Sequence, residues 1–279
     1  MTTLSRRNVL QLIGATATLG IVRSALAEHH AEDSASQHKF VLLHGAWQGG
    51  FAWNGVANRL RHAGHEVEAP TLPGMNPGDD RQGIQFADYV DAVVDVLQRQ
   101  YKPVVLVGHS SAGMLLQAAA PRAAEAIKLL VFNNAFVVAN GQSQLDNIPA
   151  DAAKLLTDLA HGTADNTVPV AGPIEGFIRS ALMEGDPQEK QDALLKRALP
   201  QPFALFSTNV KTKPFEILSI PKAVLFCARD HSADYLGMAT RLGSYQVVTA
   251  NGSHEMLFSA PAGYTKALLK LVALTHCAS

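Results

Sequence analysis

The chain has 279 residues, of which 47% are hydrophobic and 17% charged, and its formal net charge is −1. This composition is typical of a soluble globular protein that is long enough for one large α/β domain. Because no basic cluster follows the N-terminus, the charge pattern does not support a nucleic-acid-binding function.

The first 27 residues resemble an export signal. Arg6 and Arg7 precede a short apolar run over residues 12–22, and Ala25 and Ala27 form an A-x-A cleavage site. The paired arginines resemble the twin-arginine signal, whose cargo crosses the membrane already folded. The run falls short of the roughly 18 apolar residues of a membrane span, which favours a signal over an uncleaved anchor. We therefore expect an exported bacterial protein, periplasmic or secreted, with no stable membrane insertion after cleavage.

Residues 28–38 are polar and are expected to form a disordered lead-in to a domain over residues 39–279. His29, His30 and His38 could bind a metal, but a flexible tail cannot fix ligand geometry, so we predict no metal site there. Cys227 lies in an apolar run and Cys277 in the C-terminal tail, and we expect both to be free thiols.

From residue 40 onward, β-branched apolar runs alternate with helical patterns. The strands are predicted at residues 40–43, 66–69, 104–107, 127–132, 223–227 and 245–249. The main helices are predicted at residues 51–63, 86–100, 114–120, 234–242 and 261–274. This alternation predicts an α/β fold, with a doubly wound, mostly parallel sheet and helices on both of its faces.

The alternation stops between about residues 136 and 217, where no clear strand appears. Short helical runs occur there at residues 150–161 and 188–199. An insertion of this length at the carboxyl edge of the sheet is expected to form a helical cap over the site. A second domain unrelated to the site is the alternative, but sites in such sheets lie at the carboxyl ends of the strands, which favours a cap.

A strand turns abruptly into a helix at residues 108–113, GHSSAG. Such a turn strains its apex residue and requires small residues two positions before and after it. Gly108 and Ala112 meet this requirement if Ser110 is the apex. Ser111 is the rival apex, but it would put His109 where a small residue is needed. The turn would hold the Ser110 hydroxyl at a helix N-terminus, where a nucleophile is favoured, although an ordinary serine-capped turn has the same composition.

Two further loops carry candidate partners for this serine. Asp230 follows the strand at 223–227, and His254 follows the strand at 245–249. Asp230 could instead cap the next helix, and His254 could be a surface residue. However, the order Ser, acid, His is the order of a catalytic triad in doubly wound hydrolases. We therefore predict that His254 takes the proton of Ser110 and that Asp230 orients His254.

Acyl transfer also requires donors for the oxyanion, and the backbone amides of Ala46 and Ser111 are predicted to supply them. The residues predicted to line the substrate pocket are His44, Trp47, His109, Met114, Phe136 and Met256. Core packing would explain any one of the apolar members equally well.

Four motifs, in this order, resemble those of α/β-hydrolase esterases: residues 40–50 (FVLLHGAWQGG), 108–113 (GHSSAG), 227–230 (CARD) and 253–254 (SH). The branch that they resemble comprises plant methyl-ester esterases, hydroxynitrile lyases and their bacterial relatives. The resemblance covers about residues 39 to 274. It implies the α/β-hydrolase fold and a serine esterase that needs no metal or cofactor and acts on a small or medium carboxylic ester, with a methyl ester among the candidates.

The lyases of that branch carry a hydroxyl residue directly after the first-strand His and a Lys directly after the catalytic His. This chain has Gly45 and Glu255 at those places. Cyanide leaves as an anion and needs a nearby cation, which Glu255 would oppose. The resemblance therefore favours ester hydrolysis. A hydroxynitrile lyase and a non-catalytic small-molecule binding protein are the alternatives, whereas a dehalogenase or epoxide hydrolase would need a carboxylate in place of Ser110.

Overall fold

The computed structural model describes residues 37–276. The predicted signal at residues 1–27, most of the predicted lead-in and Cys277 lie outside the described residues. The compact unit begins at His38, which is buried, and its backbone N–H donates to Nδ1 of His65 at 3.2 Å. His38 therefore belongs to the folded unit and not to a flexible tail. Within the described part, no helix has the length and apolar character needed to cross a membrane.

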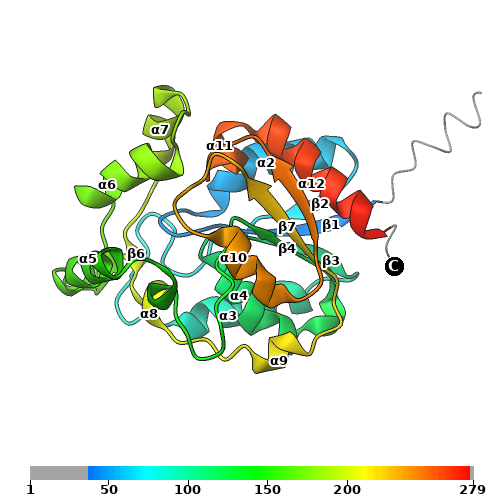
Figure 1. The fold of residues 1–279 in the computed structure, drawn as a ribbon, viewed down its shortest axis with the longest axis horizontal. Coiled ribbons are helices and arrows are strands. Elements are labelled where there is room, and N and C mark those ends of the chain that lie inside the picture. The colour runs from blue at the N-terminus through cyan, green and yellow to red at the C-terminus, as the bar shows by residue number, and fades with distance from the viewer. Residues whose placement is uncertain (1–36, 277–279) are drawn as a thin grey trace, which may run out of the picture. The chain divides into compact units, whose positions relative to one another are not determined.

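A sheet of six parallel strands, in the order β2-β1-β3-β4-β7-β8, forms the centre of the fold (Figure 1). The strands are β1 (Lys39–Leu43), β2 (Glu66–Glu68), β3 (Val104–His109), β4 (Ile127–Asn133), β7 (Lys222–Cys227) and β8 (Gln246–Ala250). The predicted doubly wound parallel sheet is confirmed. Because all strands run the same way, the loops that follow β3, β7 and β8 open at one edge.

Helices cover both faces of the sheet. They are α2 (Asn54–His62), α3 (Phe86–Gln98), α4 (Ala112–Ala119), α9 (Lys213–Glu216), α10 (Tyr235–Ala239), α11 (Met256–Ser259) and α12 (Pro261–His276). Successive side chains of a strand point to opposite faces. Phe40 and Leu42 therefore pack in the core under α2 and α12, whereas Val41 and Leu43 pack in the core under α3 and α4. Figure 1 shows these two helical layers on either side of the sheet.

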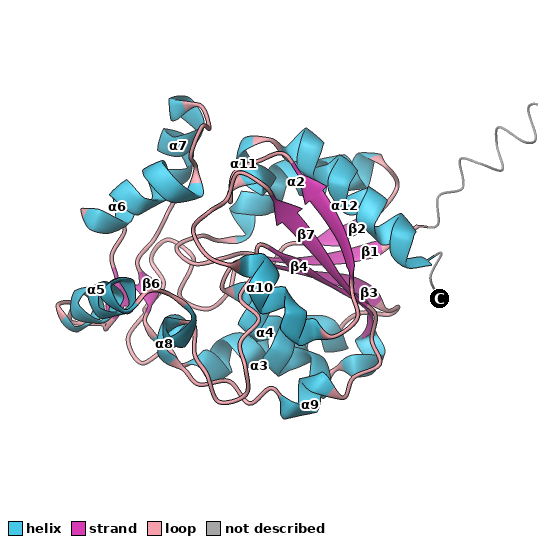
Figure 2. Ribbon diagram, viewed as in Figure 1, coloured by secondary structure: helices cyan, strands magenta, loops and turns pink. Residues whose placement is uncertain are grey.

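The insertion between β4 and β7 forms a cap at the carboxyl edge of the sheet (Figure 2). Its elements are α5 (Ala150–His161), β5 (Thr167–Val168), α6 (Pro173–Phe177), a π-helical turn (Ile178–Leu182), α7 (Gln188–Leu195), β6 (Gln201–Pro202) and α8 (Ala204–Ser207). The helix predicted at 150–161 is present, but the helix predicted at 188–199 ends at Leu195. The antiparallel pair β5–β6 is not predicted, since two residues per strand give no periodicity.

Candidate active site

The turn from β3 into α4 places its strain on Ser110. Ser110 has a φ of 55°, whereas Ser111 has a helical φ of −55°. The carbonyl of Ser110 accepts from the amides of Gly113 and Phe136, each at 3.0 Å, which fixes the turn. A Cβ on Gly108 would lie 2.4 Å from Cδ1 of Leu116, and a Cβ on Gly113 would lie 2.4 Å from the carbonyl oxygen of Phe136. The close approach that requires glycine after the apex therefore falls at Gly113, which is why Ala112 is tolerated.

The loops after β7 and β8 bring a carboxylate and an imidazole into contact. Nδ1 of His254 lies 2.5 Å from Oδ2 of Asp230, and both residues are 1% exposed. The His254 ring stacks at 5.5 Å on Tyr235, and Tyr235 also hydrogen-bonds with the side chain of Ser110. The structure therefore gathers the three residues that the sequence singles out, Ser110, Asp230 and His254, around Tyr235.

Two residues that sequence reasoning missed hold the acid of this arrangement. Asn134 donates its amide to Oδ2 of Asp230 at 2.5 Å, and Ser232 donates its backbone N–H and its hydroxyl to Oδ1 at 2.9 and 2.6 Å. Because the Ser232 proton is used on the carboxylate, Ser232 accepts from the hydroxyl of Tyr235, a third missed residue, at 3.1 Å. The one sequence signal for Asn134 is its place directly after β4, at the same edge of the sheet.

Asp230 and His254 each stabilise the charged form of the other. Burial alone would raise the pKa of Asp230, but the charge of His254 and hydrogen bonds from His254 and Ser232 hold that pKa well below its usual range. Burial alone would lower the pKa of His254, but the Asp230 carboxylate, with a smaller contribution from Glu255, raises it above its ordinary value. His254 therefore binds a proton more readily than a histidine in water.

Glu255 follows His254 and is a second buried acid beside the pair. Its Oε1 accepts from Nε2 of Gln48 at 2.6 Å, and Oε2 has no partner among the described residues. Burial raises the pKa of Glu255 to about 7, although His254 and Gln48 oppose the shift.

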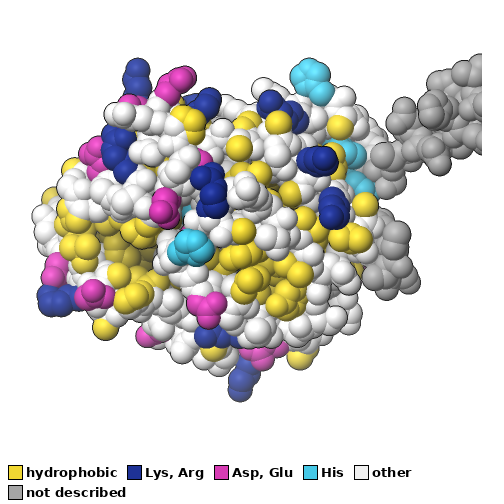
Figure 3. All heavy atoms as spheres, turned by 45° about the horizontal axis from the view of Figure 1, so that its top comes forward, with side chains coloured by type: hydrophobic (Ala, Val, Ile, Leu, Met, Phe, Trp, Pro, Cys, Tyr) yellow, Lys and Arg dark blue, Asp and Glu magenta, His cyan; other side chains and the backbone are white. Residues whose placement is uncertain are grey.

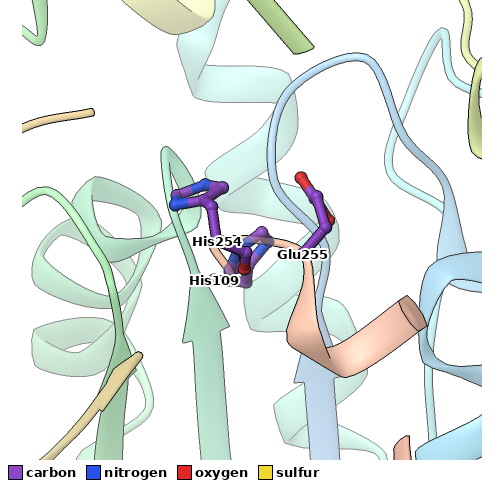
Figure 4. A group of neighbouring side chains, drawn as sticks. All are labelled: His109, His254 and Glu255. Carbon is purple, nitrogen blue, oxygen red and sulfur yellow. The ribbon is translucent and has the colours of Figure 1, made fainter. Parts of the chain in front are cut away.

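His109, His254 and Glu255 form the one group of potential metal ligands in residues 37–276 (Figure 4). Their ligand atoms lie within 4.8 Å of one another. Nδ1 of His254 is bonded to Asp230, and Nε2 of His109 is 3.1 Å from the carbonyl oxygen of His254. One nitrogen of each ring is thus engaged within the protein, and Nδ1 of His109 has no partner among the described residues.

The loop after β1 carries the backbone amide of Ala46, which is one of the two predicted oxyanion donors. No hydrogen bond to another described residue uses the amide of Ala46 or that of Ser111. The next residue, Trp47, has a φ of 61°, and its amide donates to Oε1 of Gln201 at 3.0 Å. Its indole donates to the carbonyl of Val168 at 3.2 Å. The strained loop is therefore tied to the cap strands β5 and β6, and the amides of Ala46 and Ser111 are free to bind a ligand.

A pocket of about 150 Å³ lies over Ser110, between the sheet edge and the cap. Trp47, Ser111 and Phe136 line its floor, and Tyr235 lines it from α10. The cap residues that line it are Gln144, Ile148, Pro149, Ala152, Leu155, Leu156, Pro173, Ile174, Phe177 and Leu182. Figure 3 shows hydrophobic side chains around a hollow on the face that carries the cap. The walls are mostly apolar and carry no charged side chain among the described residues.

The other four residues predicted to line the pocket lie elsewhere. His44 holds its own loop, because Nε2 accepts from the amide of Leu72 at 3.0 Å and Nδ1 donates to the carbonyl of Gly45 at 2.8 Å. Burial lowers the pKa of His44 to about 4, so the ring is neutral. His109 packs between the rings of Trp53 and His254.

Both methionines serve packing and not the pocket. Met114 is fully buried within α4, in the core under that face of the sheet. Met256 is 6% exposed and covers Gly252, where a Cβ would lie 2.3 Å from its sulfur.

Two proteins named as esterases are similar to this chain in sequence. A carbendazim hydrolyzing esterase from Nocardioides sp. (strain SG-4G) is 29% identical over 175 residues, 60% of this chain and 70% of that protein. Polyneuridine aldehyde esterase from Rauvolfia serpentina is 30% identical over 219 residues, 73% of this chain and 82% of that protein.

A similar solved structure is an extracellular alpha/beta-hydrolase from a Paenibacillus species, described as sharing structural and functional homology with tobacco Salicylic Acid Binding Protein 2. It is 26% identical, superimposes with a TM-score of 0.79, and is matched over 84% of this chain and 98% of its own. The sequence profile of the alpha/beta hydrolase family matches residues 40–267. In agreement with its motifs, this chain belongs to the alpha/beta hydrolase family.

Proposed function

We propose that the protein is a serine esterase that hydrolyses a neutral carboxylic ester through an acyl-enzyme formed on Ser110. The observation that carries the proposal is the buried 2.5 Å contact between His254 and Asp230, beside a serine held at a strained apex. The esterase names of two relatives, from Nocardioides and Rauvolfia, support the same reaction class.

In the first half of the reaction, Nε2 of His254 takes the hydroxyl proton of Ser110 while Oγ bonds to the carbonyl carbon of the ester. The carbonyl oxygen becomes an oxyanion, which accepts from the amides of Ala46 and Ser111. The bond from carbon to the alkoxy oxygen then breaks, and His254 gives its proton to the departing alcohol. Asp230 keeps the ring in the tautomer that presents Nε2 to the serine, and it stabilises the imidazolium that forms.

The second half repeats these steps with water in place of Ser110. His254 takes a proton from the water, whose oxygen bonds to the acyl carbon, and the same two amides bind the new oxyanion. The bond from carbon to Oγ breaks, Ser110 recovers its proton from His254, and the carboxylic acid leaves. The apolar pocket supports this chemistry because a low-dielectric site strengthens the interactions with the oxyanion.

Two local observations favour hydrolysis over cyanohydrin cleavage. A Cβ on residue 45 would lie 2.9 Å from Cβ of Ser110 and 3.0 Å from Nδ1 of His109, so the hydroxyl residue of the lyases has no room here. Glu255 stands where the lyases carry a cation, and its buried carboxyl would oppose a leaving cyanide.

Export through the twin-arginine route is also part of this proposal. It rests on Arg6, Arg7 and the A-x-A site ending at Ala27, and a structural relative is described as extracellular. Arg6→Lys together with Arg7→Lys should leave the protein in the cytoplasmic fraction of a bacterial host, whereas the native chain should appear in the periplasm or medium. Equal export of both forms would contradict the route.

The esterase proposal is tested with a panel of short nitrophenyl and methyl esters. Ser110→Ala should lower kcat by roughly 10³-fold or more, whereas Ser111→Ala should keep turnover within about tenfold, since only the backbone of Ser111 is used. Equal activity of all three proteins would rule out the proposed nucleophile. A folded native protein that turns over none of the esters would instead favour the lyase or the binding protein.

A further inference from the structure

The polar groups of the pocket are distributed unevenly. Ser110, Ser111, Ser232 and Tyr235 lie around the reaction centre. Ser232 is hydrogen-bonded to Asp230 and Tyr235, and Tyr235 also to Ser110. The cap side is almost wholly apolar, and Gln144 is its one amide among the described residues. Burying an unpaired amide is unfavourable, so a polar side chain on this apolar wall is expected to have a hydrogen-bond partner.

Gln144 lies in the loop between β4 and α5, just before the 3-10 turn Leu145–Asn147. Its backbone carbonyl accepts from the amide of Asn147 at 2.9 Å, which fixes the main chain at this point. The residue is only 6% exposed. Nevertheless, its side-chain amide makes no hydrogen bond with any described residue, and Oε1 is buried without a partner.

Two other buried glutamines have both ends of the amide occupied, and a third, Gln48, donates Nε2 to Glu255 while its Oε1 has no partner among the described residues. Gln117 donates to the carbonyl of Val138 at 3.0 Å and accepts from the amide of the same residue at 2.9 Å. Gln201 accepts from the amide of Trp47 and donates to the hydroxyl of Tyr89, each at 3.0 Å. Among these four buried glutamines, Gln144 is the one whose side-chain amide has no hydrogen bond to a described residue at either end, and it faces the substrate pocket.

We propose that Gln144 is a specificity-determining residue, whose amide hydrogen-bonds an uncharged polar group of the substrate within an otherwise apolar pocket. The inference rests on the proposed esterase function and defines its substrate class. The substrate is a neutral, largely apolar ester that carries one hydroxyl or amide group away from the scissile carbonyl.

The pocket chemistry sets these limits. A charged substituent would lose its hydration against walls without a compensating charge, and a neutral amide cannot replace that hydration. A purely hydrocarbon substituent would fill the apolar volume but would leave Gln144 unpaired. A hydroxyl or amide can both donate and accept, so it matches the Gln144 amide in either orientation of its oxygen and nitrogen.

The test uses methyl phenylacetates that carry a hydroxyl or a methyl group at the ortho, meta or para position. These pairs have nearly the same size and differ in hydrogen bonding, and the three positions sample the depth of the pocket. In the native protein, kcat/KM for the hydroxyl ester should exceed that for its methyl partner by about tenfold at one position at least. Gln144→Leu should bring that ratio to about one, chiefly by lowering kcat/KM for the hydroxyl ester.

Gln142→Leu is the matched control. Gln142 lies two residues away, is half-buried and accepts from the side-chain amide of Asn147 at 3.3 Å, but it does not line the pocket. It should keep the native ratio. Gln144→Met, an unbranched side chain of similar length, repeats the test should the Leu variant fold poorly. Both Gln144 variants should unfold at a temperature no lower than the native protein, because each removes an unpaired buried amide.

The outcomes separate the two proposals. A native protein that hydrolyses these esters without preferring a hydroxyl at any position, or a preference that survives in both Gln144 variants, would overturn the role of Gln144 and leave the esterase intact. Affinities measured with Ser110→Ala report the same preference without turnover. If the native protein hydrolyses no ester but Ser110→Ala still binds the hydroxyl compounds through Gln144, the esterase proposal fails while the recognition role stands.

Discussion

Nδ1 of His254 lies 2.5 Å from Oδ2 of Asp230, and the same oxygen accepts from Nδ2 of Asn134 at 2.5 Å. The three residues come from the loops after β8, β7 and β4. The Asp230 carboxylate is therefore held from the loop after β4 as well as from its own loop. Because all these loops open at one edge of a parallel sheet, the position of the base depends on the sheet itself and not on a flexible loop.

Asp230→Asn should lower kcat by roughly 10³- to 10⁴-fold with little change in KM, because an amide in this place favours the wrong tautomer of His254. Asp234→Asn is the control. Asp234 accepts from the amide of Gly237 at 2.9 Å as the N-cap of α10, and Asn caps helices equally well. Steady-state kinetics on one ester measures both variants. A loss in Asp234→Asn with full activity in Asp230→Asn would contradict the assignment of Asp230 as the acid that orients His254.

The strands, the turn at Ser110 and the loops of Asp230 and His254 could be predicted from the sequence, because each depends on local composition and on chain order. The supports of Asp230 could not be found in this way. Asn134 reaches the carboxylate through a contact between loops that are about a hundred residues apart. Two successive asparagines at the end of a strand have many ordinary explanations.

The residues that line the pocket could be predicted from the sequence only in part. His44, His109, Met114 and Met256 are close to the motifs in sequence, yet they pack in the core or hold the backbone. The residues that shape the pocket come mainly from the cap, where Ile148, Leu156 and Ile174 belong to no motif. Which cap side chains face inward is decided by how short helices pack on the sheet edge, and periodicity does not specify this.

Tyr235→Phe should lower kcat/KM by about 3- to 10-fold. The variant removes the hydroxyl that links Ser232 to Ser110, while the ring continues to stack on His254. Tyr264→Phe is a matched control, because the Tyr264 hydroxyl is buried without a partner among the described residues. That change should keep full activity and stability. Equal kinetics for the native protein and Tyr235→Phe would show that the hydroxyl has no part in the reaction.

Gly45→Ser should reduce ester hydrolysis by about 10- to 100-fold and should not produce cyanohydrin cleavage. The new Cβ would lie 2.9 Å from Cβ of Ser110, so the nucleophile has to move. Gly176→Ala is the control, because a Cβ there meets nothing within 4 Å. The activities of both variants are measured with an ester and with a cyanohydrin as substrates. New lyase activity in the Gly45→Ser variant would contradict the steric argument.

Glu255→Gln should stabilise the protein increasingly between pH 5 and 8. Burial raises the pKa of Glu255 to about 7 in the folded protein, so the folded state favours the protonated acid. That contribution is present below the ordinary pKa of a glutamate and is lost as pH rises through 7. The variant, which cannot ionise, should therefore gain up to about 3 kcal/mol over the native protein at pH 8. Denaturant unfolding at several pH values measures the difference, and a constant difference would contradict it.

The same variant should shift the pH dependence of catalysis. In the proposed reaction His254 can act as a base only when neutral. Its pKa stands above the ordinary value because Asp230, and to a smaller extent Glu255, stabilise its charged form. The kcat/KM of the native protein should therefore rise with pH through a midpoint above about 6.5.

Replacing Glu255 with Gln keeps a partner for Gln48 but removes a negative charge, so that midpoint should fall. Asp230, Asp186 and His109 also surround this site and are unchanged in the variant. Glu184→Gln, on the exposed surface, should leave the midpoint in place. An unchanged midpoint in Glu255→Gln would mean that Asp230 alone sets the basicity of His254.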